Sequence, residues 1–93
     1  SKKRYIEVKT TKSKKALMNK RFKLTPNEWD TAETMGKHYF IYYLRINEGE
    51  KNIFIINNPV EQYNKGYLKI DKNLMVEFSK DAGKWTKLIE IKH

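Results

Sequence analysis

Glu7 and Lys9 are the residues of this 93-residue chain whose types and spacing point most directly to chemistry. Ile6 and Val8 alternate with them, which predicts a half-buried strand over residues 4–10. Side chains two residues apart on a strand share one face and lie about 6.5–7 Å apart. We expect Ile6 and Val8 to face the core, and Tyr5, Glu7 and Lys9 to share the other face.

A carboxylate and an ammonium group on one face suit metal-dependent hydrolysis of a phosphodiester. The Glu7 carboxylate can bind Mg²⁺ or Mn²⁺, which prefer oxygen ligands. Lys9 can stabilise the charge that develops on a phosphate oxygen, or help to position and deprotonate the attacking water. The chain has no cysteine and two histidines, so the sequence excludes disulfides and thiolate zinc sites and disfavours a histidine metal site. An exposed ion pair of little energetic value remains the simpler interpretation of the tripeptide alone.

The charge of the chain points to a polyanionic partner. Twenty Lys and Arg against 11 Asp and Glu give a net charge of +9, which favours nucleic acid, and DNA first. Four lysines follow the candidate catalytic pair closely and could contact phosphates or form a solvated loop: Lys12, Lys14, Lys15 and Lys20. We find no signal peptide, transmembrane stretch or basic amphipathic helix, so the sequence predicts a soluble cytoplasmic protein without a membrane partner.

A helix start follows a short strand predicted over residues 21–24. Thr25 has the position of an N-cap, Pro26 that of the first helical residue, and Glu28 closes a capping box. The helix should run to Met35 and end at a left-handed Gly36. Its buried face should consist of Trp29, Ala32 and Met35. Helix capping explains Glu28 fully, and we assign it that role.

The rest of the chain predicts an α+β fold with a mixed, mostly antiparallel sheet and one main helix. Residues 38–47 should form a central strand that is covered on both faces, and residues 52–56 its hairpin partner. A short helix is expected over residues 59–65, with Asn58 as its cap. Further strands are expected over residues 67–70, 74–78 and 85–91. Four aromatic residues of the central strand are assigned to the core rather than to a base-stacking platform: Tyr39, Phe40, Tyr42 and Tyr43.

Three sequence blocks resemble a known family. Residues 5–11 (YIEVKTT), 22–29 (FKLTPNEW) and 39–44 (YFIYYL) are similar in order and content to the C-terminal domain of the plant protein NO VEIN and its bacterial relatives. The resemblance covers about residues 4–59. It implies a restriction-endonuclease-like fold of the PD-(D/E)xK superfamily, in a bacterial or archaeal restriction or phage-defence protein. Glu7 and Lys9 match the (D/E)xK pair, whereas Asn27 and Glu28 match a helix block of unassigned role.

One departure from the superfamily pattern affects the expected activity. The pattern needs an acidic residue on the strand before E-x-K, but the six residues before Glu7 include none. We therefore expect residues 1–93 to form a nuclease-like core that lacks its N-terminal part, binds metal weakly and cleaves poorly alone. Either a second chain or an upstream domain supplies the missing acid, or Asp30, Asp71 or Asp81 replaces it.

Two other functions remain open from the sequence. In the first, the chain is a non-catalytic basic module that binds DNA or a protein, and Glu7 and Lys9 are an incidental pair. In the second, it is an adapter whose exposed sheet edge, within residues 74–91, pairs with another subunit.

Overall fold

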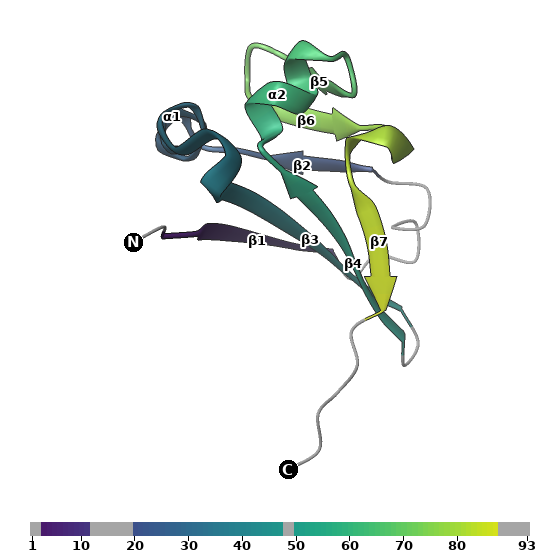
Figure 1. The fold of residues 1–93 in the computed structure, drawn as a ribbon. Coiled ribbons are helices and arrows are strands. Elements are labelled where there is room, and N and C mark those ends of the chain that lie inside the picture. Colours follow the sequence, from purple (N-terminus) through teal and green to yellow (C-terminus); the bar gives the residue numbers. More distant parts are fainter. Residues whose placement is uncertain (1–2, 12–19, 48–49, 88–93) are drawn as a thin grey trace.

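The computed structural model describes residues 3–11, 20–47 and 50–87 of the chain. Figure 1 shows a long, twisted sheet with the helices and a smaller sheet stacked on one side of it. The elements follow one another along the chain in this order: β1 (Tyr5–Thr11), β2 (Arg21–Lys23), α1 (Pro26–Met35), η2 (Gly36–His38), β3 (Tyr39–Asn47), β4 (Glu50–Asn57), α2 (Pro59–Asn64), β5 (Leu68–Ile70), β6 (Met75–Phe78), η3 (Lys80–Ala82) and β7 (Lys84–Lys87).

The strands form two sheets, which confirms the predicted mixed, mostly antiparallel α+β class. The larger sheet has the order β1-β3-β4-β7, and the smaller has the order β2-β6-β5. Only the β1–β3 pair among the described strands is parallel. The expectation of a single sheet is wrong, because β2, β5 and β6 are short strands that pair with one another and not with the larger sheet.

The core lies between the two sheets. The larger sheet contributes Tyr43 and Phe54, and the smaller contributes Phe22 and Phe78. The rings of Phe54 and Phe78 stack with centroids 4.6 Å apart, and Tyr43 meets Phe78 edge-on at 5.0 Å. Such contacts between large rings dominate the packing of a thin core. α1 adds Ala32, which is fully buried.

The helix signals of the sequence are confirmed. The Thr25 hydroxyl accepts a hydrogen bond from the Glu28 N–H at 3.1 Å, and the Glu28 carboxylate accepts one from the Thr25 N–H at 2.7 Å. Gly36 ends α1 as predicted and has a positive φ of +54°, but its ψ of −120° lies outside the left-handed helical region that we expected. Asn58 caps α2 in a left-handed conformation, and its side chain accepts a hydrogen bond from the Glu61 N–H. These caps depend on local sequence, which is why the sequence predicts them well.

The predicted orientation of β1 is wrong. Ile6 and Val8, which we expected in the core, are 45% and 54% exposed. The Glu7 and Lys9 side chains are only 20% and 19% exposed. β1 is an edge strand of the larger sheet. Glu7 and Lys9 lie on the face of this sheet that α1 and the smaller sheet cover. Register in the parallel pair places Glu7 beside Ile41, which is fully buried.

The central strand is also less covered than expected. β3 does lie between β1 and β4, but only the face with Tyr39, Ile41 and Tyr43 is buried. Phe40 and Tyr42, which we assigned to the core, are half-buried on the opposite face. Alternation along a strand puts successive side chains on opposite faces, and the described residues pack only one of them.

The structure bears on the free sheet edge that the adapter function needs and on the expected absence of a membrane span. β6 is paired on both sides, to β2 and to β5, so residues 75–78 cannot offer the free edge that the adapter function needs. β7 is an edge strand of the larger sheet, and residues 88–91 of the predicted strand lie outside the described part of the chain. Among the described residues, no helix is long and apolar enough to cross a membrane.

Candidate functional site

The candidate site is built from β1 and the first turn of α1. β1 presents Glu7 and Lys9 on its covered face, two residues apart. The Lys9 ammonium donates hydrogen bonds to both carboxylate oxygens of Glu28, at 2.9 and 3.1 Å. The same ammonium lies 3.9 Å from the nearer oxygen of Glu7. We call Glu7, Lys9 and Glu28 the acid–lysine cluster.

Glu28 is the member of this cluster that the sequence interpretation missed. Its carboxylate has two roles at once, since Oε1 accepts from both the Thr25 N–H and the Lys9 ammonium. The capping box therefore fixes the direction in which Glu28 points, and that direction is toward β1. Capping is a sufficient local reason for a glutamate at this position, and only the packing of α1 beside β1 reveals the second role.

The two carboxylates of the cluster titrate differently. Partial burial, a hydrogen bond with Glu28 and the charge of Glu28 raise the pKa of Glu7 above its usual value, against the opposing effect of Lys9. Partial burial would also raise the pKa of Glu28, but hydrogen bonds from Lys9 and from the Thr25 N–H outweigh it, and the pKa of Glu28 is lowered. Glu28 is therefore the more readily ionised of the two carboxyl groups, and ionisation of Glu7 beside it is less favourable.

Two tyrosines form the wall beside the carboxylates. Tyr5 stacks on Tyr39 with ring centroids 5.0 Å apart and an angle of 10° between the planes, and its hydroxyl donates to Glu7 at 3.3 Å. Tyr39 is fully buried, and its hydroxyl finds no hydrogen-bond partner among the described residues. Burial, followed by the charges of Glu7 and Glu28, raises the pKa of Tyr39, so this hydroxyl keeps its proton. A buried donor without a partner near two carboxylates is costly unless a further group satisfies it.

The other predicted site residues lie elsewhere. Lys12, Lys14 and Lys15 fall outside the described residues. Lys20 is exposed and precedes β2, and its carbonyl oxygen accepts a hydrogen bond from the Phe78 N–H. Lys20 therefore lies at the start of β2, whereas α1 follows the other end of that strand.

None of the three aspartates considered as a replacement acid joins the cluster. Asp71 is held in the β5–β6 turn, where it accepts from the Asn73 and Met75 N–H groups. Asp81 belongs to η3, and Asp30 is exposed on α1. Within the described residues, no group of three or more His, Cys, Asp and Glu residues could hold a metal ion. The second carboxylate beside Glu7 is Glu28 instead.

In chemical terms the cluster offers up to four carboxylate oxygens and one ammonium group, and the buried Tyr39 hydroxyl lies beside it. Oxygen donors of this kind suit Mg²⁺ and Mn²⁺. Burial and the charge of Glu28 raise the pKa of Glu7, and a cation bound beside it would favour its ionised form. The same arrangement also fastens α1 to β1 as an ion network.

Comparison with known proteins identifies the family. The model of the family described as Protein NO VEIN, C-terminal, matches residues 1–56, which include all of the acid–lysine cluster. No curated protein and no solved structure matches the chain. The matched segment is more than half of the 93 residues, and it ends within β4. The chain therefore belongs to the NO VEIN C-terminal family.

Proposed function

We propose that this chain is part of a PD-(D/E)xK-type endonuclease domain that hydrolyses DNA with Mg²⁺ or Mn²⁺, in a restriction or phage-defence protein. One observation carries the proposal. Glu28 follows Lys9 by 19 residues and belongs to another element, yet Glu7, Lys9 and Glu28 meet within hydrogen-bond or ion-pair distance on the covered face of β1. Family membership supports the proposal, because the matched segment contains the same residues.

Each residue has a definable part in this reaction. Glu7 and Glu28 would hold the metal through their carboxylate oxygens. A divalent cation bound there would polarise the phosphate and lower the pKa of a bound water. Lys9 would shift from Glu28 toward the phosphate, where its charge stabilises the negative charge of the transition state. The buried Tyr39 hydroxyl would donate a hydrogen bond to an oxygen in the site.

The site also needs a partner. Two carboxylates leave most of the octahedral coordination of Mg²⁺ to water and phosphate. We propose that a second chain or another domain supplies the further acidic ligand, and that this chain alone binds metal weakly and cleaves poorly. The DNA phosphates would be contacted by Lys12, Lys14, Lys15 and Lys20.

Calorimetric titration of Mn²⁺ tests the metal site directly. Glu7→Gln and Glu28→Gln should each weaken binding about tenfold or more, a loss of about 1.4 kcal/mol of binding free energy. Glu33→Gln is the matched control, because Glu33 is an exposed carboxylate on α1. Binding that survives both cluster substitutions would reject the metal site.

Cleavage and DNA affinity separate catalysis from binding. With the partner acid present, Glu7→Ala and Lys9→Ala should abolish nicking of plasmid DNA and leave DNA affinity within a few fold. Lys14→Ala combined with Lys15→Ala should instead weaken DNA binding. The slope of the logarithm of the binding constant against the logarithm of the salt concentration should fall in magnitude by about 0.9 for each phosphate that the variant no longer neutralises. Unchanged nicking in both cluster variants would favour the second candidate, a non-catalytic basic module, which the net charge of +9 supports equally.

A further inference from the structure

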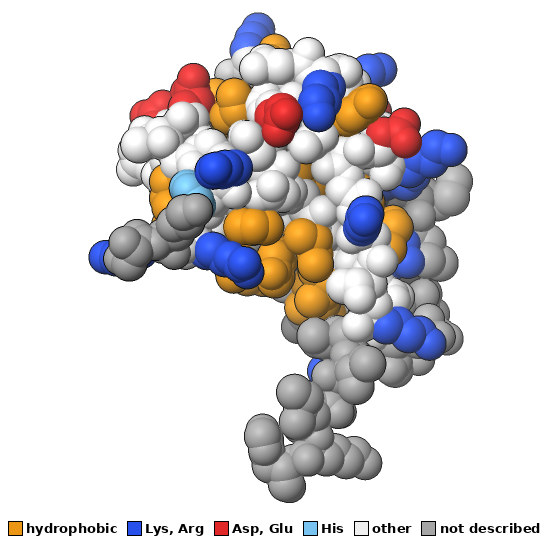
Figure 2. Space-filling view, in the orientation of Figure 1, with side chains coloured by type: hydrophobic (Ala, Val, Ile, Leu, Met, Phe, Trp, Pro, Cys, Tyr) orange, Lys and Arg blue, Asp and Glu red, His pale blue; other side chains and the backbone are white. Residues whose placement is uncertain are grey.

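One face of the larger sheet, which no other described helix or strand covers, carries a continuous apolar surface. It includes six neighbouring residues of β1, β3 and β4, which we call the open-face cluster: Ile6, Val8, Phe40, Tyr42, Leu44 and Ile55. Register makes five of them cross-strand neighbours, since Ile6 pairs with Phe40, and Val8 and Ile55 both pair with Tyr42. Leu44 follows Tyr42 by two residues on the same face of β3. Figure 2 shows hydrophobic side chains gathered in a hollow of the surface.

This surface is unusual for a strand arrangement of this kind. A mostly antiparallel sheet can leave one face in water, but that face then usually carries polar side chains. Here Val8 is 54% exposed and Ile6 is 45% exposed, and the other four members are half-buried. Large contiguous apolar patches on a protein surface generally mark an interaction site.

The rim of the open face is cationic. On the β1 side, the Arg4 guanidinium lies over the Phe40 ring, 5.6 Å from its centroid, and shares a cavity with Lys37 and Asn57. On the β7 side, Lys84 pairs with Ile55. Blue side chains flank the hydrophobic hollow in Figure 2.

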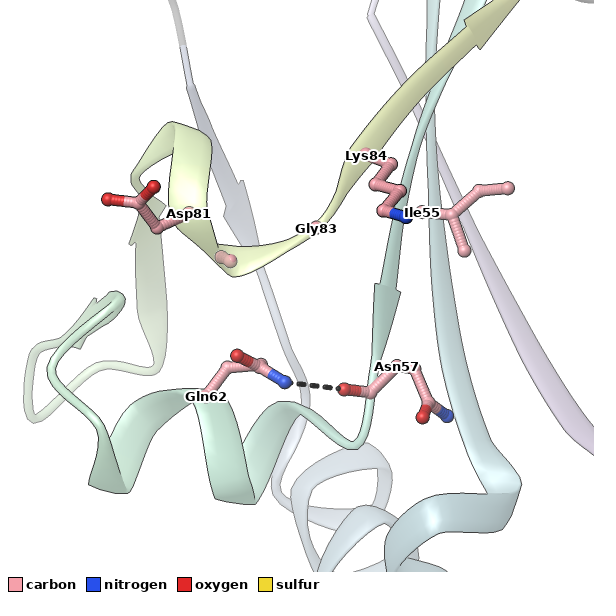
Figure 3. Close-up of a pocket in the computed structure, with 7 residues that line it drawn as sticks. Ile55, Asn57, Gln62, Asp81, Gly83 and Lys84 are labelled. Atoms are coloured by element: carbon pink, nitrogen blue, oxygen red, sulfur yellow. Dashed lines mark hydrogen bonds between the residues drawn. The ribbon is translucent and has the colours of Figure 1, made fainter.

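A second cavity deepens the surface beside Ile55. It has a volume of about 370 Å³ and lies between β4, α2 and the η3–β7 connection. Figure 3 shows that Gln62 of α2 donates a hydrogen bond to the Asn57 carbonyl oxygen at the end of β4, and that the Asp81 carboxylate points away from Lys84 and Asn57. The cavity therefore offers a place for one apolar anchor without an acidic group facing it.

The dimensions favour a helix as the occupant. β1 and β7 are three strand spacings apart, or about 14 Å at about 4.8 Å per spacing. An α-helix with its side chains is about 10–12 Å wide, so one helix fits between the two cationic margins. If a second copy of this chain bound to the face, its Arg4 and Lys84 would lie near Arg4 and Lys84 of the first copy. The repulsion between these like charges disfavours self-association.

We propose that the open face binds an amphipathic α-helix of a partner, with an apolar stripe on the open-face cluster and acidic residues on both flanks toward Arg4, Lys37 and Lys84. One apolar side chain of that helix fills the cavity beside Ile55. The proposal is independent of the nuclease function, because the acid–lysine cluster lies on the opposite face of the sheet.

Two synthetic helical peptides test the proposal with the 93-residue chain. Both have the same leucine stripe; one has glutamates on its flanks and the other has lysines. Fluorescence anisotropy should detect binding of the glutamate-flanked peptide and much weaker binding of the lysine-flanked one. Val8→Asp should weaken binding at least about tenfold because it places a charge on the apolar stripe. Arg4→Glu should weaken it about fivefold, and less in high salt.

The controls keep failure of folding apart from failure of binding. Val8 is more than half exposed, so Val8→Asp should keep the circular dichroism spectrum of the wild type. Lys69→Glu reverses an exposed charge on the other sheet and should leave binding unchanged. Equal binding of the two peptides, binding of neither, or full binding by Val8→Asp would overturn the proposal. So would concentration-dependent self-association that Val8→Asp abolishes, because it would assign the face to a second copy.

Discussion

Replacing Lys9 with methionine gives the sharpest test of the acid–lysine cluster, because it leaves two carboxylates side by side without their cation. Removing one partner of a fully buried ion pair costs about 3–5 kcal/mol, whereas exposed pairs contribute about 0–1 kcal/mol. The side chains of Lys9, Glu7 and Glu28 are 19%, 20% and 16% exposed, which lies between these limits. We therefore expect a loss of about 1–3 kcal/mol in the free energy of unfolding at neutral pH.

The pH dependence of this loss distinguishes charge repulsion from lost packing. Without Lys9, the pKa values of Glu7 and Glu28 should both rise in the folded protein. A carboxyl group whose folded pKa is raised above the unfolded value of about 4.3 contributes stability below that value and loses it as the pH rises through the folded pKa. The stability that Lys9→Met loses relative to the wild type should therefore be small near pH 4.5 and large near pH 7.5.

Thermal unfolding measured by circular dichroism at both pH values is a suitable assay. For a domain of this size, each kcal/mol shifts the midpoint by about 4–8 °C, so a loss of about 2 kcal/mol lowers it by about 8–16 °C. Lys69→Met is the matched control, since Lys69 is exposed on β5. A deficit that is equal at the two pH values, or no deficit at either, would refute the electrostatic reasoning.

Three further predictions concern the cap, the edge strand and the metal. Thr25→Ala removes the acceptor of the Glu28 N–H and should cost about 1 kcal/mol in a thermal melt; an unchanged midpoint would mean that the capping box does not stabilise α1. Gly83→Ala would place a methyl group against the Ile55 carbonyl, so β7 must shift. Denaturant unfolding followed by tryptophan fluorescence should show a loss of about 1–3 kcal/mol in the free energy of unfolding. Wild-type stability would argue against the close approach of Gly83 to Ile55. Because the pKa of Glu7 is raised, Mn²⁺ affinity in calorimetry should fall as the pH drops toward about 5, and affinity that is independent of pH would count against Glu7 as a ligand.

Features that depend on local signals could be predicted from the sequence. The capping box at Thr25, the stop at Gly36 and the cap at Asn58 all appear in the structure as predicted. The hairpin predicted over residues 38–47 and 52–56 also forms, as β3 and β4. Each of these features involves residues close in sequence, whose preferences do not depend on the rest of the fold.

The orientation of β1 could not be obtained in this way. Alternation shows that Ile6 and Val8 share a face, but either face of an edge strand can be the covered one. The assumption that the apolar face points inward is wrong, because the covered face meets the polar start of α1 at Glu28. The apolar side chains lie on the uncovered face, which is the face to which we assign the partner helix.

The sequence by itself determined the α+β class, the caps, the hairpin, the basic charge and the E-x-K pair on a strand. Only the tertiary structure decided that the strands divide into two sheets and that Glu28 joins Glu7 and Lys9. It also decided that the described helices and the smaller sheet cover only one face of the larger sheet. The physical reason is distance along the chain. Caps and turns depend on bonds within a few residues, whereas the acid–lysine cluster and the open face arise when β1, α1 and β3 pack together across about 20–40 residues.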